Sequence, residues 1–102
     1  MSAQAALKAL AEPRRQAILR LVRTGPRSVG EVARHVDITQ QAASQHLQVL
    51  KDAGLVAVRQ DGTRRLYAIR PDGLASLEEF LADLWPTGLQ RLKAAVESDE
   101  QS

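Results

Sequence analysis

The 102-residue sequence contains no cysteine and only three aromatic residues, one each of Phe, Trp and Tyr. The lack of thiols excludes disulfides, thiolate metal sites, cysteine nucleophiles and thiol redox sensing. With so few aromatic residues, the core must consist of Leu, Val, Ile and Ala, a composition typical of helical domains. A chain of this length is enough for one domain with a modest core, and we expect residues 1–102 to form it.

Long apolar runs and a targeting signal are missing as well. No run approaches the roughly 18 apolar residues that a membrane span needs. The amino terminus lacks the basic-then-apolar pattern of a signal peptide. We therefore expect a cytoplasmic protein without a membrane partner.

Residues suited to catalysis or metal binding are few. The sequence has only two histidines, His35 and His46. No Ser, His and Asp cluster and no glycine-rich phosphate loop is visible, so an enzyme is not expected. Glu78, Glu79 and Asp83 are hard oxygen ligands without soft partners. We therefore expect neither a metal nor another cofactor.

The charge is unevenly distributed along the chain. Residues 1–70 hold 12 Lys or Arg against 5 Asp or Glu, a net charge of +7, whereas residues 71–102 hold 2 against 7, a net charge of −5. The basic part would attract a polyanion, and the acidic part would be repelled by one. Solvated surfaces that differ by chance are the alternative explanation.

Four helices are predicted in the first half of the chain. Ser2 is a plausible cap for the first, Ser28 and Glu31 have capping-box spacing, and Thr39 can cap the fourth, which Gly54 ends. The predicted ranges are 2–11, 13–24, 28–36 and 40–53. The last two helices are joined by the tight turn at residues 37–39, which predicts a helix-turn-helix.

After residue 54 the apolar pattern alternates. Residues 55–60 and 64–70 flank Asp61-Gly62-Thr63, the combination that best indicates a short β-hairpin. A helical pattern then covers residues 73–96, and Pro86 should kink or divide it. Residues 96–102 are expected to be a frayed tail. The predicted fold is mainly α with a small β-hairpin, a winged helix-turn-helix.

The helix predicted at residues 40–53 has two chemically different faces. Ala43, Leu47 and Leu50 lie on one side of a helical wheel, which we assign to the core. Glutamine and serine fall on the other side, and those in the first two turns suit the base edges of a major groove. The predicted base-reading residues are Gln40, Gln41, Ser44 and Gln45. A merely polar, exposed face is the alternative, but the capped helix before it and the basic hairpin after it favour base reading.

A second set of side chains is predicted to contact the DNA backbone. Short strands of this kind can place cationic side chains beside phosphates or in a minor groove, so the hairpin would serve as a wing. The set comprises His46, Gln48, Arg59, Thr63, Arg64 and Arg65. The arginines alternatively form a solvated edge that blocks strand pairing, and His35 is expected on the surface.

A family resemblance rests on three stretches: "LAEPRRQAILRLV", "SVGEVARHVDITQQAASQHLQVLKDAGLVAVRQDGTRRLYAI" and the leucine-rich end. Together they resemble an ArsR-type (arsenic-repressor-like) winged-helix transcriptional regulator, from about Leu7 to Leu92. The resemblance implies a homodimeric, usually repressive DNA-binding protein whose first and last helices form the dimer interface. The family's metal sensors carry a Cys-x-Cys pair before the recognition helix or His and carboxylate ligands along the last helix. Neither occurs here, so metal sensing is not expected.

The last predicted helix also indicates a dimer. Its apolar residues would span an arc of about 100°, wider than one neighbour in so small a fold covers. The predicted interface residues are Leu7, Leu10, Leu77, Leu81, Leu84, Trp85 and Leu92. A two-fold axis there would place two recognition helices on a palindromic, double-stranded operator. A winged-helix protein interaction module without specific DNA binding is the alternative, and the sequence does not indicate an inducer.

Overall fold

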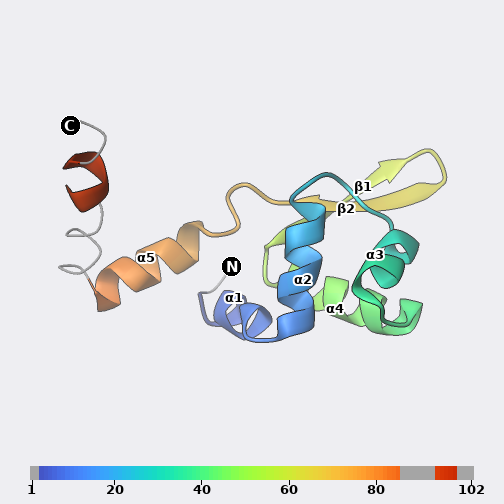
Figure 1. Cartoon of the computed structure of the whole chain (residues 1–102), viewed down its shortest axis with the longest axis horizontal. Helices are drawn as coiled ribbons and strands as arrows, with labels where there is room; N and C mark the ends of the chain where they lie inside the picture. The colour runs from blue at the N-terminus through green and yellow to red at the C-terminus, as the bar shows by residue number, and fades with distance from the viewer. Residues whose placement is uncertain (1–2, 86–93, 99–102) are drawn as a thin grey trace.

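The computed structural model of the chain describes residues 3–85 and 94–98. Its helices and strands follow in the order α1 (Ala3–Leu10), α2 (Pro13–Val22), α3 (Val29–Val36), α4 (Gln40–Asp52), β1 (Val56–Asp61), β2 (Arg64–Ile69) and α5 (Ala75–Leu84). Helices α1 to α4 and the hairpin gather into one body, and α5 leads away from it past α1 (Figure 1). The predicted mainly α fold with a small hairpin is confirmed. Within the described residues, no helix is long and apolar enough to cross a membrane.

Local capping explains where the central helices begin and end. The predicted capping box is present, since the Ser28 side chain accepts from the Glu31 N–H and the Glu31 side chain accepts from the Ser28 N–H. Thr39 Oγ1 accepts from the Ala42 N–H at 3.0 Å and starts α4. Asp37 (φ 60°) takes the left-handed conformation that ends α3. The tight turn between α3 and α4 therefore has a satisfied cap on each side.

The core lies where α1, α2, α3 and α4 meet the base of the hairpin. The predicted α4 stripe of Ala43, Leu47 and Leu50 is fully buried, as is Ile18 of α2. The remaining buried apolar residues are Ala6, Ala9, Val22, Val32, Ala33, Ala53, Leu55, Val56, Tyr67 and Leu77. No charged residue is buried among the described ones. The burial of apolar area supplies most of the stability of such a domain, which explains why the helical periodicity predicts the core well.

The hairpin pairs β1 with β2 antiparallel, from Val56 opposite Ile69 to Asp61 opposite Arg64. Gly62 and Thr63 form the turn, and Gly62 has the positive φ of 64° that glycine adopts without strain. The base of the hairpin is buried and its tip is exposed. The wing is therefore anchored in the core at its base, and its tip projects into solvent.

The end of the chain differs from the sequence-based prediction in two respects. Helix α5 ends at Leu84, and Trp85 is not helical (φ −130°, ψ 58°), because a residue before proline is disfavoured in the α region. A helical segment covers residues 94–98, two residues past the predicted end of the helical pattern at residue 96, and residues 99–102 of the expected frayed tail lie outside the described residues. The predicted Ser2 cap, the predicted kink at Pro86 and Leu92 also lie outside the described residues.

The connection from β2 to α5 depends on a close approach of two backbone segments. A Cβ atom added to Gly73 would lie 2.5 Å from the Gly54 carbonyl oxygen and 3.1 Å from the Leu55 Cα. Both atoms belong to the backbone, so the neighbouring chain would have to move. Gly73 thus allows α5 to start directly against the end of α4.

We predict that Gly73→Ala lowers the free energy of unfolding by about 1–3 kcal/mol, as overpacking usually does. Urea denaturation followed by circular dichroism measures the change. The matched control is Gly30→Ala, because a Cβ there would meet only flexible side-chain ends at 3.5 and 3.6 Å. That substitution should stabilise α3 by up to about 1 kcal/mol. Equal stability of the two variants would contradict the close-approach argument.

Candidate nucleic-acid interface

The first two turns of α4 carry an exposed row of short polar side chains. Gln40, Gln41, Ser44 and Gln45 are all exposed, while the opposite side of the same helix is buried in the core. The burial of that stripe fixes the rotation of α4, and so it also fixes the direction in which these side chains project. The structure thus brings the four residues predicted to read bases together on one solvent-facing surface, named here the glutamine face.

Gln48 lies one turn further along the same exposed side of α4, whereas His46 lies beside the buried stripe, and each has a partner within the protein. Gln48 Nε2 donates to Asp52 Oδ1 at 2.8 Å, one turn further along α4. The half-buried His46 places Nδ1 3.3 Å from Arg15 Nη1 of α2. That these two residues contact the DNA backbone stays a prediction.

Arg15 has a structural role that the sequence reasoning missed. Its Nε donates to the Ala9 carbonyl at 2.7 Å and its Nη2 donates to the Lys8 carbonyl at 3.1 Å, in addition to the contact with His46. One side chain therefore links the end of α1 to α2 and α4. A signal was present in the sequence, since α1 ends without a glycine cap and its last carbonyls need donors from elsewhere.

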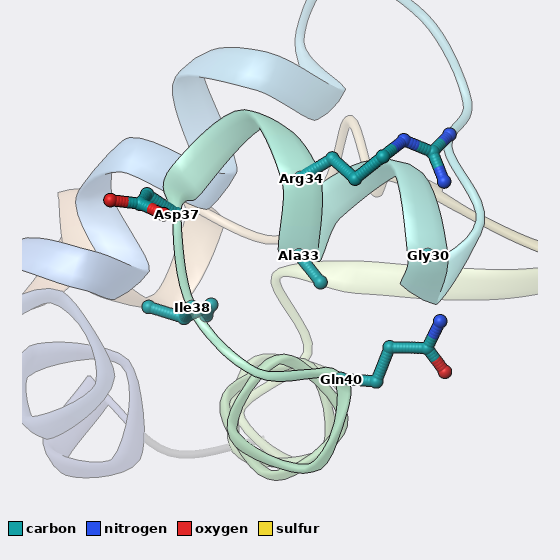
Figure 2. Close-up of a pocket in the computed structure, with 6 residues that line it drawn as sticks. All are labelled: Gly30, Ala33, Arg34, Asp37, Ile38 and Gln40. Carbon is teal, nitrogen blue, oxygen red and sulfur yellow. The ribbon is translucent and has the colours of Figure 1, made fainter.

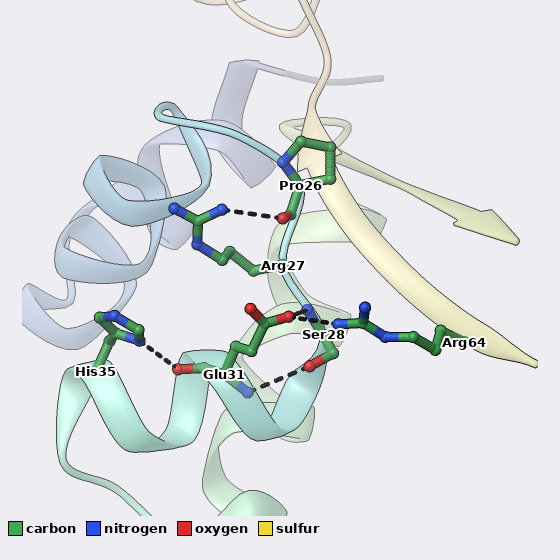
Figure 3. A network of polar contacts seen from close by, with 6 residues as sticks. All are labelled: Pro26, Arg27, Ser28, Glu31, His35 and Arg64. Atoms are coloured by element: carbon green, nitrogen blue, oxygen red, sulfur yellow. Dashed lines mark hydrogen bonds and ion pairs between the residues drawn. The ribbon is translucent and has the colours of Figure 1, made fainter. Parts of the chain in front are cut away.

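The wing presents its cations around an exposed tip. Arg59, Thr63 and Arg65 are exposed, and no ion pair or hydrogen bond of the Arg59 or Arg65 side chain is seen within residues 3–85 and 94–98. Arg64 differs, because its Nη2 donates to Glu31 Oε1 at 2.8 Å (Figure 3). The wing therefore offers two uncommitted guanidinium groups and uses a third as a tether.

Glu31 is the residue on which this tether depends. Its Oε1 accepts from the Ser28 N–H at 3.1 Å as well as from Arg64, and its own N–H donates to Ser28 Oγ at 3.3 Å (Figure 3). The hydrogen bond from the Ser28 backbone is the main cause that lowers the pKa of Glu31 below its ordinary value of 4.5, and Arg64 lowers it further. The carboxylate thus stays charged and joins the start of α3 to the wing.

A second connection holds the wing by its backbone. The Arg27 N–H donates to the Tyr67 carbonyl at 2.9 Å, and the Tyr67 N–H donates to the Arg27 carbonyl at 2.7 Å. The segment between α2 and α3, predicted only as the end of a helix, therefore adds a bridge at the edge of the hairpin. Together with the Glu31–Arg64 pair, this bridge sets the position of the wing relative to α3.

An open groove of about 430 Å³ lies between α3 and the start of α4. Figure 2 shows the Arg34 guanidinium and the Gln40 amide on the same side of this groove as Gly30, with Asp37 on the other side. Since Gly30 has no side chain, the two donor groups remain accessible above it. The sequence reasoning missed Arg34, which only the turn between the two helices brings beside Gln40.

The predicted dimer-interface residues divide into two groups. Leu77 is buried, and Leu7, Leu10 and Leu81 are half-buried against the core of the same chain. The exposed apolar side chains at the end of α5 are Leu84 (51% exposed) and Trp85 (63% exposed). Trp85 therefore does not belong to the core of its own chain. Leu77, Leu81 and Leu84 lie on α5, whereas Trp85 follows the last residue of this helix and so does not share its apolar arc.

No group of three or more His, Cys, Asp or Glu residues is placed to hold a metal ion within the described parts of the chain. His35, for example, is exposed and directs Nδ1 to the Glu31 carbonyl at 2.9 Å.

The fold and this surface define a class of protein. Two short helices joined by a tight turn, an exposed polar face on the second helix and an arginine-bearing hairpin together form a winged helix-turn-helix. A family model described as a helix-turn-helix domain matches residues 10–59.

Relatives and solved structures narrow the class to a family. The HTH-type transcriptional regulator Rv2034 of Mycobacterium tuberculosis is 43% identical over 92% of this chain and 88% of that protein. The structure of an ArsR family transcriptional regulator is 30% identical with a TM-score of 0.70, covering 82% of this chain and 90% of that one. The homodimeric winged helix-turn-helix DNA-binding domain of a possible ArsR-family regulator from Mycobacterium bovis is 38% identical with a TM-score of 0.66, covering 78% and 77%.

This chain therefore belongs to the ArsR-type winged helix-turn-helix transcriptional regulators. The resemblance seen in the sequence is confirmed, and with it the expected class of function.

We predict that Glu31→Gln is less stable than the wild type near neutral pH and that the difference narrows at low pH. The pKa of Glu31 is lower in the folded chain than in the unfolded chain. Its contribution is therefore complete above about pH 4.5 and is lost as the pH falls through the folded pKa. Thermal denaturation of both proteins between about pH 7 and about pH 3 measures this difference.

The matched control is Glu79→Gln, which removes an exposed carboxylate of α5 that makes no hydrogen bond within the described residues. This control measures the general effect of removing one negative charge. A difference between Glu31→Gln and the wild type that stays constant with pH would contradict the assigned role of the carboxylate.

Proposed function

We propose that the protein is a homodimeric repressor that binds a palindromic DNA operator through the glutamine face of α4. The observation that carries this proposal is the exposed row of Gln40, Gln41, Ser44 and Gln45 on a helix whose rotation the core fixes. Glutamine can pair with adenine through two hydrogen bonds in the major groove, and serine can serve several bases. A bound dimer covering its operator would exclude other proteins from the same DNA.

The wing and the α3–α4 groove would contact the DNA backbone. Arg59 and Arg65 are exposed cations near the tip, and their charge suits phosphates whatever the base sequence. Arg34 joins this set because its guanidinium lies beside the Gln40 amide at the start of the recognition helix. Arg64 is assigned to hold the wing in place rather than to bind a phosphate.

The end of α5 and α1 would form the dimer interface. Helix α5 packs against α1, and its exposed end presents Leu84 and Trp85 to solvent. Apolar side chains this exposed favour a contact with a second copy. The acidic residues of the last third of the chain would then lie near the two-fold axis, away from the phosphates.

We predict that Gln45→Ala weakens binding to the cognate operator by about 1–3 kcal/mol and relaxes its sequence preference.

We predict that Arg65→Ala instead weakens binding to all sequences. It should also reduce the slope of log affinity against log salt concentration by roughly one, because one phosphate contact is lost. Competition binding at several salt concentrations measures both effects. Arg70→Ala is the control, because Arg70 pairs with Asp72 at the base of the hairpin.

The operator itself can be found by selection from random DNA. An unchanged preference in Gln45→Ala would refute base reading by this residue. A wild-type protein retained on no DNA at low salt would refute the proposed function and favour an interaction module.

We predict that Leu84→Asp gives a folded monomer at micromolar concentration. An unpaired carboxylate in an interface costs several kcal/mol, which is enough to separate a dimer at that concentration. Leu81 is less suitable for this test because it packs against the core of its own chain. Sedimentation and affinity for full and half operators measure the effect.

The control is Glu79→Ala, five residues earlier and about 140° around α5 from Leu84. It should leave both the dimer and the affinity for the full operator unchanged. A Leu84→Asp protein that remains a dimer would show that this end of α5 is not the interface.

A further inference from the structure

An apolar pocket of about 480 Å³ lies on a different part of the molecule from the proposed DNA contacts. It is enclosed by the ends of α1 and α2, by the base of the hairpin and by the start of α5. Its walls include Leu10, Leu19, Leu55, Ile69, Leu74 and Leu77. No residue of the glutamine face or the wing tip lines it. The volume falls within the usual range for small-molecule pockets, about 300–1,000 Å³.

Part of this apolar wall is left in contact with solvent. Leu74 is 46% exposed and Ile69 is 37% exposed, although both adjoin fully or nearly fully buried residues such as Leu55. Covering such a surface with an alkyl chain is favourable by about 25 cal/mol for each Å² removed from water. The pocket therefore suits the apolar part of a ligand.

The rim of the pocket carries positive charge. Arg20 lies in the last turn of α2 and Arg23 is the residue that caps its end. Both are exposed, and neither makes an ion pair or hydrogen bond through its side chain within residues 3–85 and 94–98. Two like charges at this spacing repel each other, and an anion between them would relieve the repulsion. The third rim cation, Arg70, is already paired with Asp72 at 3.1 Å.

We propose that this pocket binds a medium-chain carboxylic acid, with the alkyl chain against Leu19, Leu55 and Leu74 and the carboxylate on Arg20 and Arg23. Apolar walls alone would accept any apolar molecule, whereas Arg20 and Arg23, which lie three residues apart at the end of α2, favour an anionic head group. The ligand thus has a defined orientation, with its tail toward α5 and its head toward α2.

Binding of the acid does not require DNA, but its regulatory effect rests on the proposed function. Leu10 and Leu77 line the pocket and also belong to α1 and α5, which we assign to the dimer interface. A ligand that contacts both helices would therefore change the affinity of the dimer and, through it, of the operator complex.

Calorimetric titration of the full chain with octanoate, below its micelle-forming concentration, tests the site directly. We expect saturable binding of one octanoate per chain with a Kd on the order of 0.1–1 mM, given the efficiency of ligands this small. Acetate, which lacks the tail, should not bind measurably. 1-Octanol, which lacks the carboxylate, should bind about tenfold more weakly than octanoate.

Two variants separate the contributions of the head and tail. Arg20→Gln/Arg23→Gln should weaken octanoate binding about tenfold and leave 1-octanol binding unchanged. Leu74→Gln should weaken both, and it is tolerable for folding because Leu74 is exposed. The matched control is Arg14→Gln/Arg59→Gln, which removes the same charge from exposed arginines outside the pocket.

No saturable binding, many octanoates per chain, or equal affinity for octanoate and 1-octanol would overturn the proposal. So would an equal loss of octanoate affinity in the control variant, since that would indicate general electrostatic attraction. A protein that binds octanoate in this way but never binds DNA would refute the proposed function and leave the pocket assignment intact.

Discussion

The geometry of the proposed DNA interface depends on the Glu31 carboxylate, which connects α3 to the wing. It caps α3 through Ser28 and holds the wing through Arg64 at 2.8 Å. Without this contact and the Arg27–Tyr67 bridge, the hairpin would be held mainly by its buried base, and its exposed tip would be less restrained relative to α3. A wing contributes to a defined DNA contact only when its angle to the recognition helix is fixed before binding. Otherwise its cations would have to be ordered during binding, and that ordering would reduce the affinity.

A second side-chain contact connects α4, which carries the glutamine face, to α1, which we assign to the dimer interface. Arg15 donates to the last carbonyls of α1 and contacts His46 of α4, so one side chain connects the two helices. The contact is made by one half-buried side chain that touches all three helices. The end of α1 and the helix that carries the glutamine face are therefore connected through two side chains, Arg15 and His46.

The sequence predicts those features that depend on near neighbours along the chain. The Ser28–Glu31 box, the Thr39 cap, the buried α4 stripe and the hairpin turn at Gly62 all follow from spacings of a few residues. The ties between elements do not, because Arg64 meets Glu31 across 33 residues and Arg15 meets His46 across 31. Nothing in local periodicity selects one arginine among many for such a contact. Trp85 is a different case, because Pro86 predicts a break in the helix, and the restriction that proline places on the preceding residue explains why the helix already ends at Leu84.

The α3–α4 groove and the pocket between α1, α2 and α5 differ in chemistry in a way that fits separate functions. The α3–α4 groove joins a guanidinium to an amide above a glycine and is open, which suits an anionic backbone that arrives from outside. The α1–α2–α5 pocket has apolar walls and a cationic rim, which suits a small amphiphile instead. A ligand alters DNA affinity only if it binds the DNA-bound and the free protein with unequal affinity. The Leu10 wall of the pocket belongs to α1, whose end contacts Arg15, and Arg15 also contacts His46 of α4, so a ligand in the pocket would touch a helix that is connected to the one carrying the glutamine face.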